Sequence, residues 1–259
     1  MWSSRSLIPP MLGLGLLACQ AAAPSLSPEP VSAANPEALN SQGNTARDNK
    51  DYAEAMRLYR EAAAIGDAAA MNYIGRLYQN GWGVAADYSE AMRWFRLAAE
   101  KGNAAAMDNI GWFYQNGWGV APDYGEAMRW YRQAAERGSA AAMNNIGALY
   151  QYGRGVPQNY REAMRWYRQS AERGNLTAVN NIGFLYQKGL GVPPDYGEAM
   201  RWYHQAADRG NVTAMSNIGV LYQDGLGVPK DLGTAVAWYR RAADLGSLGA
   251  KEALARLGQ

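Results

Sequence analysis

The chain has 259 residues, and its 25 Lys and Arg residues nearly balance its 23 Asp and Glu residues, which gives a formal charge of +2. Nucleic-acid-binding domains carry a basic excess that this chain lacks, so we expect no nucleic-acid partner. One Cys and one His are too few ligands for a zinc site and exclude a disulfide within the chain. We therefore expect no metal and no other cofactor.

Residues 1–18 have the pattern of a secretory signal. Arg5 supplies one positive charge, and the apolar run that follows, from Leu7 to Ala18, has twelve residues, fewer than the roughly 20 that span a bilayer. The run ends in Leu16-Leu17-Ala18-Cys19, which resembles the bacterial lipobox, where a signal peptidase cuts before a lipid-modified Cys. The resemblance implies lipidation of Cys19. An ordinary cleaved signal, with secretion of the protein, remains the alternative.

Residues 19–36 are rich in Ala, Ser and Pro and have too little apolar bulk to form a core. Their prolines favour extended conformations, so the segment is predicted to be a tether that reaches about 50 Å at roughly 3.1 Å per residue. Gln20 follows the Cys, as it does in outer-membrane lipoproteins that resemble this one. We therefore expect a lipid-anchored protein of the cell envelope that faces the periplasm, with the outer membrane favoured.

The remainder of the chain repeats one pattern. A glycine recurs every 36 residues, at Gly66, Gly102, Gly138, Gly174, Gly210 and Gly246. The predicted parts are a shorter hairpin over residues 37–66, five complete units over residues 67–102, 103–138, 139–174, 175–210 and 211–246, and a single helix over residues 247–259. A fixed period of this length is typical of solenoids, in which each repeat packs only against its neighbours.

The second unit shows how each repeat is expected to fold. Apolar residues at helical spacing, from Ala106 to Tyr114, predict a first helix, which the Gly- and Pro-rich run 117–122 ends. Asp123 then has the position of an N-cap, with Glu126 as its capping-box partner. A second helix starts there and continues to the next periodic glycine. Each unit is therefore a helical hairpin.

A glycine also stands inside each first helix, at Gly111 in the second unit. Glycine costs about 1 kcal/mol relative to Ala in a helix, so a steric demand must require it. The second helix offers Ala134 and Ala135 in register, and we expect close helix approach against these small residues. The Trp at helical spacing in each second helix, such as Trp130, is assigned to the core rather than to a sugar-stacking ladder.

Three motifs recur through residues 67–246: Gly-x-Leu-Tyr, Gly-x-Gly-Val and Asp-Tyr-x-Glu-Ala-Met-x-Trp-Tyr-x-x-Ala-Ala. They resemble the Sel-one-like repeat, a relative of the tetratricopeptide repeat, and residues 37–66 resemble a tetratricopeptide hairpin. The resemblance implies an all-α, right-handed α-solenoid superhelix of stacked antiparallel helix pairs. Polar residues at the first helix, Gln42 and Thr45, and Ala255 in place of the internal glycine at the last helix predict two solvent-facing ends.

We predict that the chain is not an enzyme. The loop over residues 81–86 fits a Gly-x-Gly-x-x-Ala fingerprint only superficially, because a helix rather than a strand precedes it. His204 occupies a position that other units fill with Arg, and the unit supplies no nucleophile or orienting partner for it. The sequence has no nucleophile-elbow, zinc-protease or P-loop motif.

Binding is predicted on the exposed and variable side of the first helices, because first helices line the concave groove in proteins that resemble this one. The predicted groove positions are Tyr73, Arg76, Asn109, Trp112, Asn145, Tyr152, Asn181, Phe184, Lys188 and Asn217. Amides can donate to and accept from an extended peptide backbone, while rings act as anchors that select among sequences. A second interpretation stays open: the Asn side chains satisfy helix ends or one another between stacked units.

The sequence thus predicts a non-catalytic scaffold or adaptor of the bacterial cell envelope that binds a protein or peptide partner. One alternative is a peptidoglycan or polysaccharide binder that uses Trp82, Trp112 and Trp118. Another is a hydrolase of β-lactam or cell-wall substrates, an activity associated with some cysteine-rich repeat proteins that resemble this one. The paired cysteines of those relatives are absent here, which speaks against the hydrolase.

Overall fold

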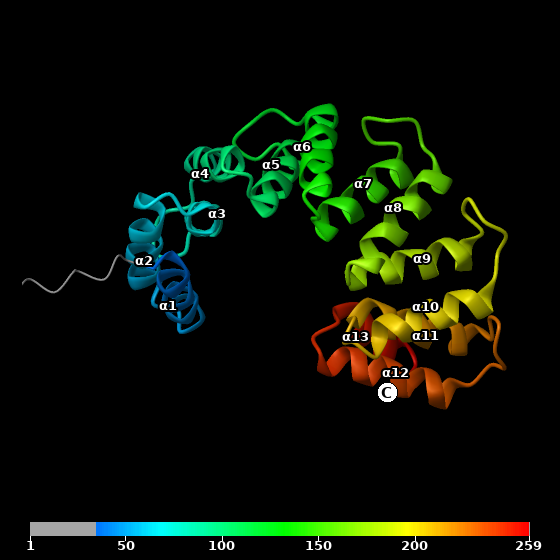
Figure 1. Ribbon diagram of the computed structural model, residues 1–259. Helices are drawn as coiled ribbons and strands as arrows, with labels where there is room; N and C mark the ends of the chain where they lie inside the picture. The colour runs from blue at the N-terminus through cyan, green and yellow to red at the C-terminus, as the bar shows by residue number, and fades with distance from the viewer. Residues whose placement is uncertain (1–34, 259) are drawn as a thin grey trace, which may run out of the picture. The chain divides into compact units, whose positions relative to one another are not determined.

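The computed structural model describes residues 35–258, and within that range every regular element is an α-helix (Figure 1). The helices are α1 (Pro36–Asp48), α2 (Tyr52–Ala64), α3 (Ala68–Asn80), α4 (Tyr88–Glu100), α5 (Ala104–Asn116), α6 (Tyr124–Glu136), α7 (Ala140–Tyr152), α8 (Tyr160–Glu172), α9 (Leu176–Lys188), α10 (Tyr196–Ala207), α11 (Val212–Asp224), α12 (Leu232–Asp244) and α13 (Leu248–Arg256). The predicted signal, Cys19 and the tether up to residue 34 lie outside the described residues. Asn35 caps α1, which begins at Pro36.

The helices pack in the order of the chain. Each first helix packs against the second helix of its own unit, and each second helix packs against the first helix of the next unit, from α1 through to α13. The predicted all-α solenoid of stacked helix pairs is therefore confirmed. At its two ends Gln42 and Thr45 of α1 and Ala255 of α13 are exposed.

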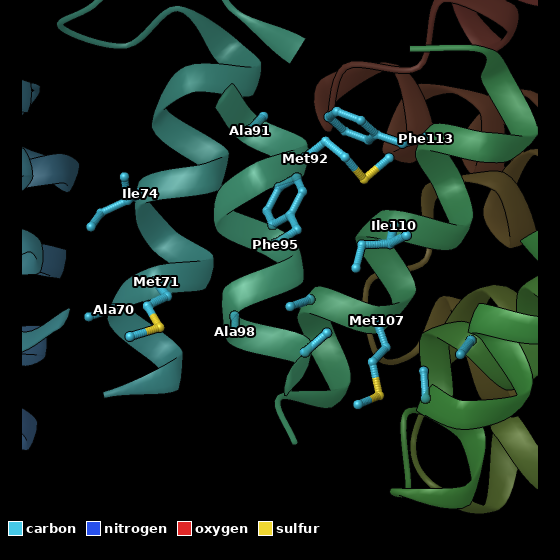
Figure 2. Packing of buried hydrophobic residues seen from close by; sticks show 14 of the residues in the cluster. Ala70, Met71, Ile74, Ala91, Met92, Phe95, Ala98, Met107, Ile110 and Phe113 are labelled. Carbon is cyan, nitrogen blue, oxygen red and sulfur yellow. The ribbon is translucent and has the colours of Figure 1, made fainter. Parts of the chain in front are cut away.

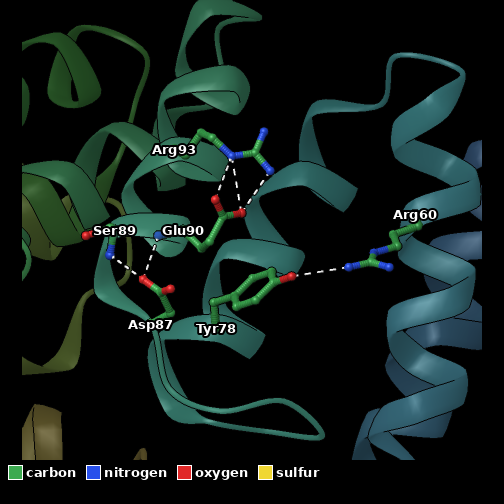
Figure 3. A network of polar contacts seen from close by, with 6 residues as sticks. All are labelled: Arg60, Tyr78, Asp87, Ser89, Glu90 and Arg93. Carbon is green, nitrogen blue, oxygen red and sulfur yellow. Dashed lines mark hydrogen bonds and ion pairs between the residues drawn. The ribbon is translucent and has the colours of Figure 1, made fainter.

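The helix boundaries follow from local capping. In the first repeat the Oδ1 of Asp87 accepts hydrogen bonds from the backbone N–H groups of Ser89 (2.9 Å) and Glu90 (3.0 Å), which starts α4 (Figure 3). The reciprocal half of the predicted capping box does not form. The backbone N–H of Asp87 donates to the carbonyl of Tyr78, and the carboxylate of Glu90 pairs with Arg93 at 2.9 Å. Because the backbone already satisfies the cap N–H, the Glu side chain is left for the exposed ion pair.

The core consists of small and medium apolar side chains from adjacent helices. Figure 2 shows Phe95 of α4 between α3, which carries Ala70, Met71 and Ile74, and α5, and it shows Met92 beside Phe113 of α5. One aromatic ring per second helix is fully buried, and these rings belong to Tyr59, Phe95, Tyr131, Tyr167, Tyr203 and Tyr239. The hydrophobic stripe of each second helix therefore centres on this ring.

The glycine inside each first helix lies against that buried ring. A Cβ placed on Gly111 would come within 2.7 Å of Cδ1 of Tyr131, and one on Gly147 within 2.6 Å of Cε1 of Tyr167. The predicted steric demand is thus confirmed. The predicted partner is wrong, because the ring of the second helix, rather than Ala134 and Ala135, occupies the space above the glycine.

The Trp of each second helix is only half-buried, in contrast to the core position that the sequence predicts for it. Trp94, Trp130 and Trp166 pack against the edge of the core, one residue before the buried ring. Two of them meet arginines: the guanidinium carbon of Arg93 lies 4.9 Å from the ring centroid of Trp94, and that of Arg165 lies 6.0 Å from the ring centroid of Trp166. Helical spacing alone does not separate the centre of an apolar stripe from its edge.

Candidate partner-binding surface

The predicted groove positions all lie on one side of α3, α5, α7, α9 and α11, and we call this surface the first-helix face. Its side chains differ in exposure. Arg76, Tyr152 and Lys188 are exposed, whereas Tyr73, Asn109, Trp112, Asn145, Asn181, Phe184 and Asn217 are half-buried. Tyr73 is held within the fold, because its ring lies 4.9 Å from the ring of Tyr59.

The Asn column forms a row of hydrogen bonds between consecutive units. The Nδ2 of Asn109 donates to the Oδ1 of Asn72 at 2.9 Å. The same bond links Asn145 to Asp108 (3.0 Å), Asn181 to Asn144 (3.1 Å) and Asn217 to Asn180 (2.9 Å). These contacts favour the second interpretation of the Asn residues, in which they satisfy one another between stacked units.

Each of these pairs still has hydrogen-bonding capacity to spare. One bond uses a single amide hydrogen and a single lone pair, while a primary amide has two hydrogens and an oxygen with two lone pairs. The amide oxygen and the second amide hydrogen of Asn109 have no other partner within residues 35–258, and Asn109 is half-buried, whereas Asn72 is only 5% exposed. The row therefore holds the units together and also presents polar groups on the first-helix face.

The acceptors of this row are not among the residues predicted from the sequence. From α5 onwards each acceptor stands one position before an Asn, so that two polar residues follow each other, as in Asp108-Asn109 and Asn144-Asn145, whereas Asn72 precedes Tyr73. That doublet is a readable signal. Its meaning depends on a partner 37 residues away, which helical periodicity does not specify.

A pocket of about 390 Å³ lies between α3 and α5 on the first-helix face. It is lined by Asn72, Arg76, Gln79, Asn80, Trp82, Ala105, Asp108, Asn109 and Trp112, and we call it the α3–α5 pocket. Of the predicted positions it brings together Arg76, Asn109 and Trp112. The remaining predicted positions on α7, α9 and α11 do not contribute to it, and Asp108 and Gln79 were not predicted.

The composition of the α3–α5 pocket depends on one ring in α4. In the later repeats the buried Tyr hydroxyl donates to a Gln of the first helix, as Tyr167 does to the Oε1 of Gln151 at 2.7 Å. The first repeat has Phe95 at this position, and a phenyl ring has no hydroxyl to donate. Gln79 consequently lacks this bond, and its side chain lines the pocket instead.

Asp108 is the unusual charge of this pocket. The equivalent positions of the other units hold Asn72, Asn144, Asn180 and Ser216, which are all neutral. Burial raises the pKa of the Asp108 carboxyl to about 6, and the hydrogen bond from Asn145 acts in the opposite direction. The carboxyl of Asp108 in turn helps to raise the pKa of the buried Tyr131 hydroxyl, after burial itself.

Replacing Asp108 with Asn should stabilise the protein in a pH-dependent way. Because the pKa of Asp108 is higher in the folded state than its ordinary value of 3.8, the stability of the wild type falls as the pH rises from about 4 to about 6. Asp108→Asn removes this loss. We expect the variant to unfold with a free energy about 3 kcal/mol higher than wild type at pH 8 and a nearly equal one at pH 4, as measured by urea denaturation.

The matched control for this measurement is Asp224→Asn, because Asp224 is an exposed acid at the end of α11. It should leave stability unchanged at both pH values. A gap between Asp108→Asn and wild type that is the same at pH 4 and pH 8 would contradict the assigned cause, which is burial of the charged carboxylate.

The rings that the polysaccharide alternative relies on are partly used within the fold. Trp82 stacks on Tyr52, with centroids 5.5 Å apart and ring planes at 12°. Trp118 stacks on Tyr88 at 4.9 Å and also meets the edge of Trp112 at 4.1 Å. A sugar-binding ring needs an open face, so these contacts reduce the aromatic surface available for stacking.

His204 packs against Trp238 in an edge-on arrangement, with ring centroids 5.3 Å apart. Within residues 35–258, no three His, Cys, Asp or Glu side chains gather in a way that could hold a metal ion. The helices of the same range are also too short or too polar to cross a membrane.

Comparison with known proteins identifies the repeat. The family model described as Sel1 repeat matches residues 68–103, 104–139, 140–175, 177–211 and 212–247, and a tetratricopeptide repeat model matches residues 37–66. A search of the curated proteins found no match.

Solved structures agree with this assignment. The Sel1 repeat protein from Oxalobacter formigenes is 35% identical over 85% of this chain and 88% of that chain, with a TM-score of 0.76. The protein c5321, a protective antigen of uropathogenic Escherichia coli with an SLR fold, is 34% identical over 86% of this chain and 48% of its own length, with a TM-score of 0.67. Pseudomonas aeruginosa pilF shares the fold at 18% identity and a TM-score of 0.59, with 85% of this chain and 97% of that one covered. The repeats and the whole-length likeness together show that the chain belongs to the Sel1 repeat family.

Proposed function

We propose that this protein is a non-catalytic scaffold that holds an extended segment of a partner protein along its first-helix face. Sel1 and tetratricopeptide repeats generally mediate protein–protein interaction, and five Sel1 repeats make up most of this chain. The observation that carries the proposal is the composition of the first-helix face. It combines a repeating row of amides with spare hydrogen-bonding groups and a polar pocket beside Trp112.

The amides and the aromatic rings of this face would each contribute to binding such a segment. Amide groups at repeat spacing can pair with the backbone of an extended segment whatever its sequence. Trp112, Phe184 and the exposed ring of Tyr152 differ from unit to unit, so they would select the side chains that the segment carries. The second-helix side differs, because its exposed positions hold Glu–Arg pairs such as Glu162–Arg165 at 3.1 Å, and each such pair contributes little energy.

The proposal includes a place in the cell. We propose that Cys19 is lipid-modified and that the protein is attached to the cell envelope, facing the periplasm and preferably on the outer membrane. The support is the lipobox-like Leu16-Leu17-Ala18-Cys19 and the Gln that follows it. An acyl anchor followed by a Pro-rich segment would place the repeats within reach of other envelope proteins.

Site-specific photocrosslinking in intact cells tests the scaffold. A photoreactive phenylalanine analogue is placed at Trp112, at Phe184 or at Arg129, an exposed residue of the second helix α6 that pairs with Glu126 and does not line the α3–α5 pocket. We expect the same crosslinked partner from positions 112 and 184 and none from position 129. If position 129 gives the same products, or if positions 112 and 184 give none, the first-helix face is not the binding surface.

Fractionation of the same cells tests the proposed lipid anchor at Cys19. Crosslinked material from the wild type should sediment with the membrane fraction, whereas a Cys19→Ser variant should leave it. Retention of Cys19→Ser in the membrane fraction would contradict lipidation at this residue, and it would leave the binding surface to be judged by the crosslinks alone.

A further inference from the structure

We propose that the α3–α5 pocket receives a lysine or arginine side chain of the partner segment, with Asp108 as its counter-ion. This inference rests on the scaffold function proposed above and names the chemistry of the partner at one position. It is carried by a partly buried carboxylate that the fold itself leaves without a cation.

The inter-repeat hydrogen bond does not require a charge at position 108. Asn145 donates to Asp108 at 3.0 Å, and the neutral Asn72, Asn144 and Asn180 accept the equivalent bonds at 2.9–3.1 Å. An Asn at position 108 would serve equally well, and it would avoid the cost of placing a charge away from water. The acid is therefore unexplained by the stacking of the repeats.

The fold supplies no cation to Asp108. The one hydrogen bond to its carboxyl comes from Asn145, and no Lys or Arg within residues 35–258 forms an ion pair with it. Among α3, α5, α7 and α9, Asp108 is the single acidic residue. A partner cation that reaches this point would find the only negative charge along four consecutive first helices.

The rest of the α3–α5 pocket suits a basic side chain. The amide oxygens of Asn109 and Gln79 are free to accept hydrogen bonds, and an ammonium or guanidinium group has only donors to offer. Trp82 and Trp112 border the same space, and the part of each ring that Tyr52 or Trp118 does not cover can contact the apolar stem of a Lys or Arg and attract its charge. The lining of the pocket therefore combines hydrogen-bond acceptors with aromatic rings.

Arg76 lines the same pocket but does not reverse its preference. Its side chain is exposed, whereas that of Asp108 is half-buried. Water screens an exposed charge far more than a buried one, so the carboxylate dominates the sign of the field inside the pocket. A volume of about 390 Å³ lies near the lower end for ligand pockets, which suits one side chain of an extended segment.

Peptide selection with the full-length protein tests the inference. A random dodecapeptide phage library is selected against wild-type protein, and the recovered peptides are synthesised and measured by fluorescence anisotropy at pH 7.5. We expect a Lys or Arg at a fixed place in the selected motif. Asp108→Asn should weaken binding of such a peptide at least tenfold, and replacing the basic residue of the peptide with norleucine should weaken it to the same degree.

The decisive comparison is the double change. If the basic side chain meets Asp108, the norleucine peptide should bind wild type and Asp108→Asn equally well. Asp224→Asn, the exposed acid of α11, should bind the original peptide like wild type. The Asn variant is expected to fold, because Asn occupies the same position in three other repeats, and circular dichroism confirms this before binding is measured.

The outcomes separate this inference from the function beneath it. Selected peptides that bind Asp108→Asn as tightly as wild type, yet lose affinity on Trp112→Ala, overturn the counter-ion and leave the scaffold standing. Peptides whose binding is indifferent to Trp112→Ala and Phe184→Ala, or the recovery of no peptide at all, overturn the scaffold and this inference together.

Discussion

Tyr167→Ala is expected to lower the free energy of unfolding by about 3–5 kcal/mol, the usual cost of removing a large buried ring. The Tyr167 side chain is 1% exposed, lies over Gly147 of α7 and belongs to the core between α8 and α9. Its hydroxyl donates to the Oε1 of Gln151 at 2.7 Å, and Gln151 is itself buried. The substitution therefore opens a cavity and also leaves a buried amide without its donor. Urea denaturation followed by circular dichroism measures the loss.

Tyr167→Phe separates the ring from its hydroxyl. It keeps the ring and removes the donor, so we expect it to cost about 1–2 kcal/mol, the penalty of one unsatisfied buried polar group. Phe95 shows that the fold accepts a phenyl ring at this position in the first repeat. If Phe costs as much as Ala, the hydrogen bond rather than the packing of the ring would be the main contribution.

The loss of stability in Tyr167→Ala should also be local. Within residues 35–258 the repeats pack chiefly against their neighbours, so the loss of one buried ring weakens its own hairpin and the two interfaces beside it. Hydrogen exchange of backbone amides in α7 and α8 should accelerate in Tyr167→Ala, while exchange in α3 and α4 stays near the wild-type rate. Uniform acceleration along the chain would show that the repeats unfold as one unit.

The helices themselves could be predicted because their boundaries are set by neighbouring residues. Asn103 caps α5 through the backbone N–H of Ala106 at 2.8 Å, and Gly117 ends that helix at a φ of +71°. Both signals lie within the unit and recur at a fixed period. A prediction that uses only residues close in sequence succeeds when the physics that it describes is equally local.

The surface was harder to predict because it depends on contacts between units. Periodicity placed Asn109 on the right side of its helix, but its partner Asn72 is reached only when the two hairpins stack at a particular offset. Trp94 was assigned to the core for a related reason, since the helical stripe gives a face and not the depth of each residue on it.

The α3–α5 pocket depends on two single departures from the repeat. Phe95 lacks the hydroxyl that donates a hydrogen bond to the corresponding Gln in later repeats, and Asp108 replaces a neutral residue. A method that looks for what the units share passes over both changes. Positions where one repeat differs from all the others are therefore the ones to inspect for function in a regular solenoid.

Gly147→Val is expected to lower the free energy of unfolding by about 3 kcal/mol, near the upper end for overpacking a core. A Cβ at this position would lie 2.6 Å from Cε1 and 2.7 Å from Cδ1 of Tyr167. The ring is fully enclosed, so relief requires α7 and α8 to move apart. Gly147→Ala should cost about 1–2 kcal/mol, although Ala is the better helix former by about 1 kcal/mol.

Helix propensity alone predicts that Gly147→Ala stabilises the protein. A loss of stability would therefore identify the clash with the Tyr167 ring as the cause. Gly249 in α13 is a helical glycine around which a Cβ would meet no atom within 4 Å, so Gly249→Ala should raise stability by up to about 1 kcal/mol. A double-mutant cycle tests whether the Tyr167 ring is the reason for the glycine. Once Tyr167→Ala has removed the ring, Gly147→Ala should no longer destabilise, because its methyl group then enters the space that the ring occupied. If Gly147→Ala costs the same with and without the ring, the glycine is required for a reason other than its contact with Tyr167.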